Sequence, residues 1–300
     1  MLSIALMDVR RILSSKATWF LLLISLATMG FKTVQFSMDQ VGLMPNVSSL
    51  DVSGFLPFLT SAAELADGLD IPARDSSPLL RLMLSFRFLD YLALTSIVVF
   101  GGFFAQDIDS DYVSMRRCRG LSPRSIFAAN AITIAVVSSV LTAIAIVSLF
   151  VVCLGVNPRS VNSLTHGQQV LQYVGFLPQE AASTPIAYVA LFMVLYTGVL
   201  SFLGMLGFFA ARISRKVLVA SVAPALLILL LGRLAPGLPW LFMAFSYDNL
   251  SFANRGIVDL EVAFKYAGTY PLWFCALLLI GVLDPDLFAT IRKARAWLNR

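Results

Sequence analysis

The sequence contains little charge. Only 13% of its 300 residues are Asp, Glu, Lys or Arg, whereas 58% are hydrophobic and the mean hydropathy is +0.83. A typical soluble domain carries about 25% charged residues. Fully buried helices of a soluble protein also lack charge, but a soluble fold of this length has no place for six such helices. The composition therefore excludes a soluble domain and predicts an integral membrane protein.

Cysteine and histidine are also scarce. Cys118, Cys153 and Cys275 lie far apart, which excludes a disulfide framework and a zinc site. The single histidine, His166, stands in a polar segment and is interpreted as a solvated loop residue. No Gly-x-x-x-x-Gly-Lys-Ser/Thr phosphate loop occurs, so the chain cannot by itself bind ATP in that way. We expect no cofactor, no metal and no enzymatic activity in this chain alone.

Long apolar runs dominate what is present. A helix needs about 20 residues to cross about 30 Å of hydrocarbon, and six charge-free runs approach or exceed that length. The runs are 17–31, 91–106, 125–158, 181–211, 217–232 and 266–283. We expect an all-α integral membrane protein with about six spans, which form one transmembrane domain over residues 1–300.

The basic residues predict the orientation. With the N-terminus inside and six spans, the inner segments hold 14 of the 22 basic residues and six acids, a balance of +8. The outer segments then hold the remaining eight bases and 11 acids, a balance of −3. Because Lys and Arg in short loops favour the cytoplasmic side, both termini are predicted to be cytoplasmic. The net charge of +5 therefore reflects topology, and we expect no nucleic-acid partner.

Three further segments are predicted around the spans. Residues 1–15 have apolar side chains at helical spacing, with Ser3, Asp8, Arg10 and Arg11 on the other side, so we expect an amphipathic helix along the inner membrane surface. Residues 38–87 form a long outer loop. The apolar run that begins at Pro239 and ends at Phe245 is too short to span, and we expect a re-entrant or interfacial helix there.

The inner loop 107–124 has the most specific pattern. Its acids come first and its bases follow, which suits a short helix because each charge complements the dipole end that it occupies. Gly120 is predicted to end that helix, and Ser122 with Pro123 to start the next one. An ordinary loop of a positive-inside protein is the alternative interpretation.

The chain resembles the permease subunits of type-2 ATP-binding-cassette exporters. The first cytoplasmic loop of that family runs from an acidic residue through Gly-Thr to a Gly-x-Ser-Arg or Gly-x-Ser-Pro-Arg element. Here Asp109 and Asp111 match the start and Gly120-Leu-Ser-Pro-Arg124 matches the end, while Tyr112-Val113 stands roughly where the family has Gly-Thr. The segment that begins Arg212-Ile-Ser-Arg-Lys is similar to the second cytoplasmic loop.

The resemblance implies a function and its partners. Such a permease forms the substrate path, dimerises with itself or a similar permease, and docks on cytoplasmic ATPase subunits that bind ATP and Mg. A bacterial plasma membrane is the expected location, and a hydrophobic drug, a lipid or an amphipathic peptide the expected substrate. The predicted ATPase interface comprises Asp109, Asp111, Arg116, Arg117, Arg119, Gly120, Ser122, Pro123, Arg124, Arg212, Arg215 and Lys216.

Two other functions and one internal contact stay open at this point. A single-chain ion-coupled carrier would show internal repeats with interrupted spans, and none is convincing. A membrane-embedded enzyme would need clustered catalytic groups within the spans, and only scattered ones occur. Two interpretations of Lys32 and Asp90 stay open: an ion pair near the outer ends of the first two spans, because an unpaired charge near lipid is costly, or contact of each with interfacial water.

Overall fold

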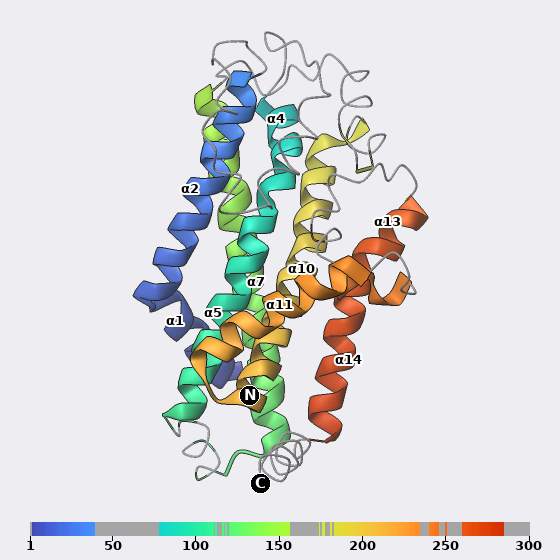
Figure 1. Cartoon of the computed structure of the whole chain (residues 1–300). Coiled ribbons are helices and arrows are strands. Elements are labelled where there is room, and N and C mark those ends of the chain that lie inside the picture. Colours follow the sequence, from blue (N-terminus) through green and yellow to red (C-terminus); the bar gives the residue numbers. More distant parts are fainter. Residues whose placement is uncertain are drawn as a thin grey trace.

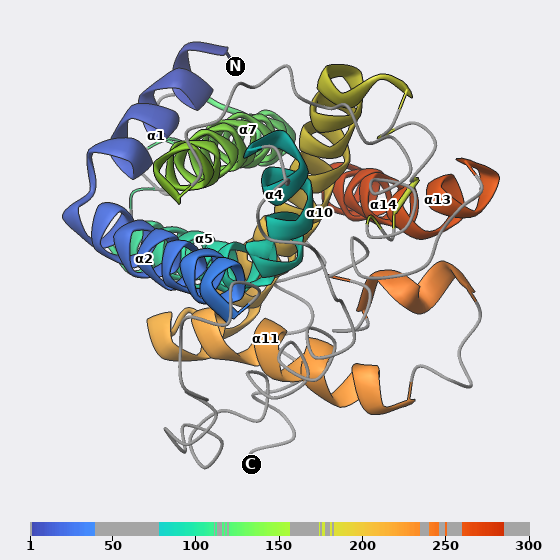
Figure 2. The same cartoon turned by 90° about the horizontal axis from the view of Figure 1, so that it is seen from above.

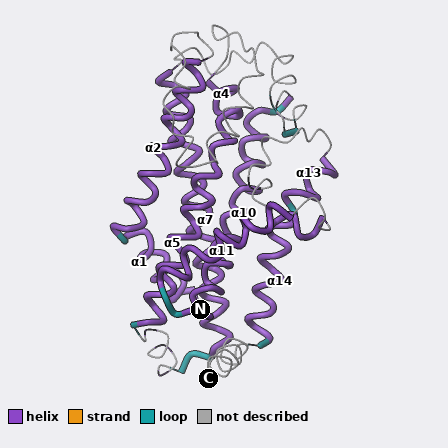
Figure 3. Tube along the Cα trace, in the orientation of Figure 1, coloured by secondary structure: helices purple, strands orange, loops and turns teal. Residues whose placement is uncertain are grey.

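The structure is a computed structural model that describes the helical parts of the chain. The described residues are 2–39, 78–110, 112, 116, 118, 120–156, 174, 176, 177, 181, 183–234, 240–245, 250 and 260–284. Every element within them is a helix, as the tube in Figure 3 shows. The predicted all-α class is therefore confirmed.

Five helical segments are long and apolar enough to cross a membrane. They are Lys16–Gln35, Leu82–Asp109, Pro123–Gly155, Pro185–Ser214 and Glu261–Leu283. The first segment lies in α2 (Lys16–Asp39), and the second combines α4 (Pro78–Ser85), η3 (Phe86–Leu89) and α5 (Asp90–Asp109). The third and fourth lie in α7 (Pro123–Val156) and α10 (Pro185–Ser214). The fifth combines α13 (Leu260–Ala267) with α14 (Thr269–Leu283). The fold is that of a multi-pass membrane protein.

The sixth predicted span differs from the other five. Residues 217–232 lie in α11 (Val217–Leu234), whose apolar stretch Val217–Leu231 is shorter than those of the spanning helices. Fifteen helical residues rise about 22 Å, which is less than the hydrocarbon thickness. Figure 2 shows α11 lying across the bundle, whereas α7 and α14 are viewed nearly end-on. Within the described residues, the sixth predicted span is therefore a shorter, oblique apolar helix beside five helices that are long enough to cross a membrane.

The second span also begins earlier than predicted. The sequence analysis placed Arg87 in the outer loop because of its charge, but its side chain is buried and its Nε donates to the carbonyl of Leu84 at 2.9 Å. Beside it, Phe86 stacks on Phe192 of α10 with ring centroids 4.1 Å apart. Local hydrogen bonding and aromatic packing therefore bring this arginine inside the bundle. Residues 40–77 of the predicted outer loop lie outside the described residues.

Helices α5 and α10 pack at the centre of the bundle. Their backbones approach closely at glycines: a Cβ on Gly207 would lie 3.0 Å from the backbone nitrogen of Gly101. A Cβ on Gly101 would in turn overlap the carbonyl of Ala220, where α11 crosses α5. Small residues allow such approach in membrane bundles, where van der Waals packing drives association. The position of α11 across the bundle depends on this crossing.

The last third of the chain packs through aromatic rings. The 3₁₀ helix η5 (Trp240–Phe245) lies where the sequence analysis predicts a short non-spanning segment. Phe245 meets Trp273 of α14 edge-on at 5.0 Å and Phe202 of α10 at 5.2 Å. These contacts hold η5 against the bundle.

Several helix ends lie together at one end of the bundle. Helix α1 (Leu2–Ser14) lies at the lower end of Figure 1, with the C-terminal end of α5, the N-terminal end of α7, and the turn between α10 and α11. We call this the α1 end. In Figure 2, α1 runs lengthwise along the edge of the bundle, roughly perpendicular to α7.

Candidate functional site

Helix α1 turns a polar residue toward the bundle. The sequence analysis placed Asp8 on the side opposite the apolar residues, but Asp8 is 0% exposed, and Leu2 and Leu6 are 65% and 56% exposed. The buried side chains of α1 are Ala5, Asp8 and Ile12, at spacings of three and four. The side of α1 that faces the bundle therefore includes Asp8, because Asp8 pairs with Arg116 of the loop between α5 and α7.

Asp8 is paired with an arginine 108 positions away. The Nη2 of Arg116 donates to Oδ1 of Asp8, and its Nη1 lies 3.5 Å from Oδ1 of Asn130 on α7. The Arg116 and Asn130 residues are each only 5% exposed. A buried guanidinium between a carboxylate and an amide oxygen makes charge-assisted bonds, which are stronger than neutral ones.

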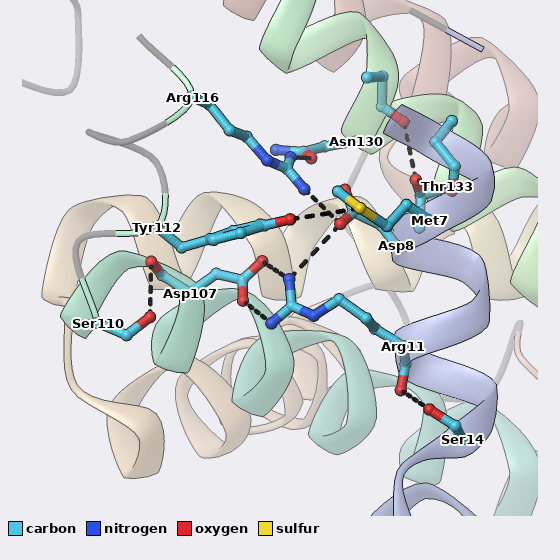
Figure 4. A network of polar contacts seen from close by, with 12 residues as sticks. Met7, Asp8, Arg11, Ser14, Asp107, Ser110, Tyr112, Arg116, Asn130 and Thr133 are labelled. Carbon is cyan, nitrogen blue, oxygen red and sulfur yellow. Dashed lines mark hydrogen bonds and ion pairs between the residues drawn. The ribbon is translucent and has the colours of Figure 1, made fainter. Parts of the chain in front are cut away.

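Arg11 forms the second ion pair of the site. Its Nη2 donates to Oδ1 of Asp107 at 2.6 Å and its Nη1 to Oδ2 at 3.2 Å, which is a forked contact with the end of α5. The same Nη1 lies 3.6 Å from Oδ1 of Asp8. Arg11 therefore bridges both carboxylates, as Figure 4 shows.

A tyrosine ring lies between the two guanidinium groups. The Cζ of Arg11 is 4.4 Å from the centroid of the Tyr112 ring, and the Cζ of Arg116 is 4.3 Å from it. Cations over an aromatic face are attracted by its quadrupole. Tyr112 also donates to Sδ of Met7 at 3.9 Å. We call Asp8, Arg11, Asp107, Tyr112, Arg116 and Asn130 the polar cluster.

The polar cluster is electrically balanced, with two carboxylates and two guanidinium groups. Burial alone would lower the pKa of Arg116, but its hydrogen bonds with Asp8 and Tyr112 and their charges outweigh burial and raise the pKa. The pKa of Arg11 is likewise raised: burial opposes this, and the bond to Asp107 prevails. Both arginines therefore stay charged, and the cluster works as an ion-pair junction rather than as an acid or base.

Helix α7 also touches the backbone of α1. The Oγ1 of Thr133 lies 3.3 Å from the carbonyl oxygen of Ala5, and both residues are buried. The small side chain of Ala5 allows this approach. The cluster and this contact together join α1 to α5, to the loop and to α7.

The turn after Arg116 is built as the sequence predicts. Gly120 has φ of +80°, and the N–H of Leu121 donates to the carbonyl of Arg116 at 3.4 Å, the six-to-one bond of a Schellman motif. The Oγ of Ser122 accepts from the N–H of Ser125 at 3.1 Å, so Ser122 caps α7, which begins at Pro123. The predictions for Gly120, Ser122 and Pro123 as helix boundaries are confirmed.

The other predicted interface residues divide by exposure. The side chains of Asp109, Arg124, Arg215 and Lys216 are exposed at the α1 end, whereas Arg212 is half-buried with its Cζ 5.9 Å from the Phe208 ring. Arg116 is buried within the polar cluster. Asp111, Arg117 and Arg119 lie outside the described residues.

Lys32, one member of the predicted pair with Asp90, has a partner on its own helix. The Nζ of Lys32 donates to Oε1 of Gln35 at 3.3 Å, one turn along its own helix. The amide gives the ammonium a partner without a contact to the next span.

Sequence reasoning missed most of the polar cluster. Asp8 and Arg11 were predicted only on the polar side of the N-terminal helix, Asp107 only as the start of the inner loop, and Asn130 carried no assignment. A usable signal was the stripe of Ala5, Asp8 and Ile12, which places one acid among small and apolar residues. Tyr112 was noted only as a departure from the family pattern.

The described residues hold no group of three or more His, Cys, Asp or Glu side chains that could bind a metal ion. Comparison with known proteins adds no name: no protein family, curated protein or solved structure matches the chain. The fold and composition therefore define a multi-pass, all-α membrane protein with a buried ion-pair junction at the α1 end.

Proposed function

We propose that this chain is the membrane-spanning subunit of an ATP-driven exporter, and that it couples to a separate cytoplasmic ATPase subunit at the α1 end. The observation that carries the proposal is the turn between Arg116 and α7. It is closed by Gly120, capped by Ser122, and exposed at Cys118 and Arg124. A turn of this kind, anchored at its base by a buried arginine, suits insertion into a groove of a partner.

The exposed charges at the α1 end support a partner with acidic side chains. Arg124, Arg215 and Lys216 are exposed there and begin or precede membrane helices. Arginine makes forked hydrogen bonds with carboxylates, which favours it at such contacts. Rim contacts contribute little each, whereas truncation of a buried charged contact costs about 2–5 kcal/mol.

Arg116 takes a different role from the one expected from the sequence. Its guanidinium is bonded to Asp8 and Asn130 and faces Tyr112, so it holds the loop in place rather than contacting a partner. We therefore assign the partner contact to the exposed bases and the positioning of the loop to Arg116.

The interior of the bundle supports an apolar or amphipathic substrate. Phe100, Phe104, Phe127 and Phe208 are buried between α5, α7 and α10, with Phe104 and Phe208 edge-on at 4.8 Å. A hydrophobic drug, a lipid or an amphipathic peptide would suit such surroundings. A dimer, of two copies or with a similar permease, completes the proposed exporter in a bacterial plasma membrane, with the α1 end cytoplasmic and with ATP and Mg on the ATPase subunit.

Charge reversal of the exposed bases tests the proposal. The triple variant Arg124→Glu, Arg215→Glu, Lys216→Glu should insert in the membrane but lose co-purification with a cytoplasmic ATPase subunit and lose ATP-dependent export. The reason is electrostatic, because the new carboxylates would repel an acidic groove. Since lost positive charge can also disturb orientation, topology is checked in the same variant.

Lys265→Glu provides the control, because Lys265 is an exposed base of α13, away from the α1 end. It should keep both ATPase binding and export. A correctly inserted triple variant that still binds the ATPase and exports would contradict the docking assignment. Export that needs an ion gradient and no ATPase subunit would contradict the exporter and favour an ion-coupled carrier.

A further inference from the structure

We propose that α1 is a releasable latch on the loop between α5 and α7, and that Asp8 is the residue that holds the latch closed. The inference goes beyond the proposed function, because it concerns how the loop is held and not which partner the loop meets. It rests on four features of the polar cluster.

The first feature is the reach of α1. Side chains of α1 contact the end of α5 at Asp107 and the loop at Tyr112 and Arg116, and the backbone of α1 accepts from Thr133 near the start of α7. The contact with Asn130 runs through Arg116. Among the described residues, Asp8, Arg11 and Met7 make the polar contacts between α1 and the loop (Figure 4).

The second feature is the way the loop residues are joined. Tyr112 and Arg116 are four positions apart, and the Arg116 guanidinium stacks on the Tyr112 ring at 4.3 Å. The opposite partner of the ring is Arg11 of α1, at 4.4 Å. If Arg116 leaves Asp8, Tyr112 leaves Arg11 with it, so this part of the loop separates from α1 as one unit.

The third feature is a second cation that is ready to pair with Asp8. The Nη1 of Arg11 already lies 3.6 Å from Oδ1 of Asp8. The departure of Arg116 therefore does not leave a buried carboxylate without a counter-ion, which is the arrangement that would make release prohibitively costly. Arg11 is also anchored by its forked contact with Asp107, so it stays in place.

The fourth feature is incomplete hydrogen bonding in the closed state. Within the described part of the chain, the buried Oδ2 of Asp8 and Nε of Arg116 have no hydrogen-bond partner. A buried ion pair whose remaining atoms are unsatisfied repays little of its desolvation cost. The closed latch is therefore specific in geometry but modest in net stability, as a switchable contact requires.

Hydrogen exchange tests the latch without any partner protein. In the purified full chain in lipid nanodiscs, Asp8→Asn should speed amide exchange over residues 112–121 by about tenfold, the factor expected when a charge-assisted hydrogen bond is lost. Exchange in the α10 core, residues 199–208, should stay as in the unchanged protein. The double variant Asp8→Arg, Arg116→Asp should recover protection of the loop.

Arg10→Gln is the matched control, because Arg10 is exposed on the same helix and has no part in the cluster. If Asp8→Asn does not accumulate, Arg116→Gln removes the same bond from the loop side and should give the same acceleration. Unchanged exchange over 112–121 in these variants would overturn the latch. So would equal acceleration in the α10 core, or in Arg10→Gln, because the effect would then be general rather than local.

Discussion

At the scale of single residues, two kinds of chemistry determine the α1 end. Gly120 and Ser122 act locally, one through a positive φ and the other through a side-chain cap. Asp8 and Arg116 act over 108 positions of sequence and are buried together. The local pair shapes the turn, and the distant pair holds that turn against α1.

The positive φ of Gly120 makes a direct prediction. No atom lies within 4 Å of a Cβ added at Gly120, so Gly120→Ala meets no clash, yet the left-handed backbone should cost about 1–2 kcal/mol. Gly155 also has open space around a Cβ, but its φ is not positive. Thermal unfolding in detergent should therefore show a lower midpoint for Gly120→Ala and no loss for Gly155→Ala. Equal midpoints for the two variants would contradict the strain.

Features that depend on local interactions could be predicted from the sequence, whereas features that depend on tertiary contacts could not. The local chemistry of Gly120, Ser122 and Pro123 indicates helix boundaries and does not depend on tertiary contacts. The burial of Asp8 depends on Arg116, which is itself bonded to Asn130 and meets Asp8 only in the folded bundle. The burial of the segment around Arg87 likewise depends on another helix, because the adjacent Phe86 stacks on Phe192 of α10.

At the scale of elements, the spanning helices follow from length and apolarity, and their packing follows from small residues. A charge-free run of sufficient length is a strong signal because the backbone must satisfy its hydrogen bonds within the helix. The oblique course of α11 was not predictable, because it depends on the close crossing at Gly101 and Ala220. The run 217–232 was predicted as a span from its charge-free length alone.

Two adjacent glycines of α5 provide a matched test of that crossing. A Cβ on Gly101 would overlap the carbonyl of Ala220, whereas a Cβ on Gly102 would meet only the Oγ of Ser221 at 3.5 Å and a side-chain carbon of Val217 at 3.9 Å. Gly101→Ala should destabilise the protein by about 1–3 kcal/mol through overpacking. Gly102→Ala should leave the unfolding midpoint nearly unchanged. A tolerated Gly101→Ala would show that α11 does not cross α5 so closely.

At the scale of the whole molecule, several ends of the described helices lie on the same side of the bundle. Helix α1, the turn between α10 and α11, and the C-terminal end of α14 lie at the same end of the bundle (Figure 1). That arrangement agrees with the predicted placement of both termini on one side. The charge balance of +8 against −3, counted with six spans, predicts that this side is cytoplasmic.

Cysteine labelling in intact cells checks the orientation. In a cysteine-free form, single cysteines at Ser77 and Ser163 should react with an impermeant reagent, and one at Ser214 should not. Ser77 and Ser163 lie outside the described residues, and Ser214 ends α10 at the α1 end. Labelling at Ser214 in intact cells would overturn the orientation.

The central claim is that a cytoplasmic ATPase docks on the turn that follows Arg116, and native Cys118 allows a direct test. Cys118 is exposed on that turn, and Cys275 is exposed on α14. A photoactivatable thiol reagent would be attached to forms that keep only one of these cysteines, in native membranes of cells that produce the chain. We predict that irradiation joins the Cys118 form, and not the Cys275 form, to an ATP-binding subunit. A Cys118 form that inserts correctly, carries the reagent and still yields no cross-link to an ATP-binding subunit would contradict the account.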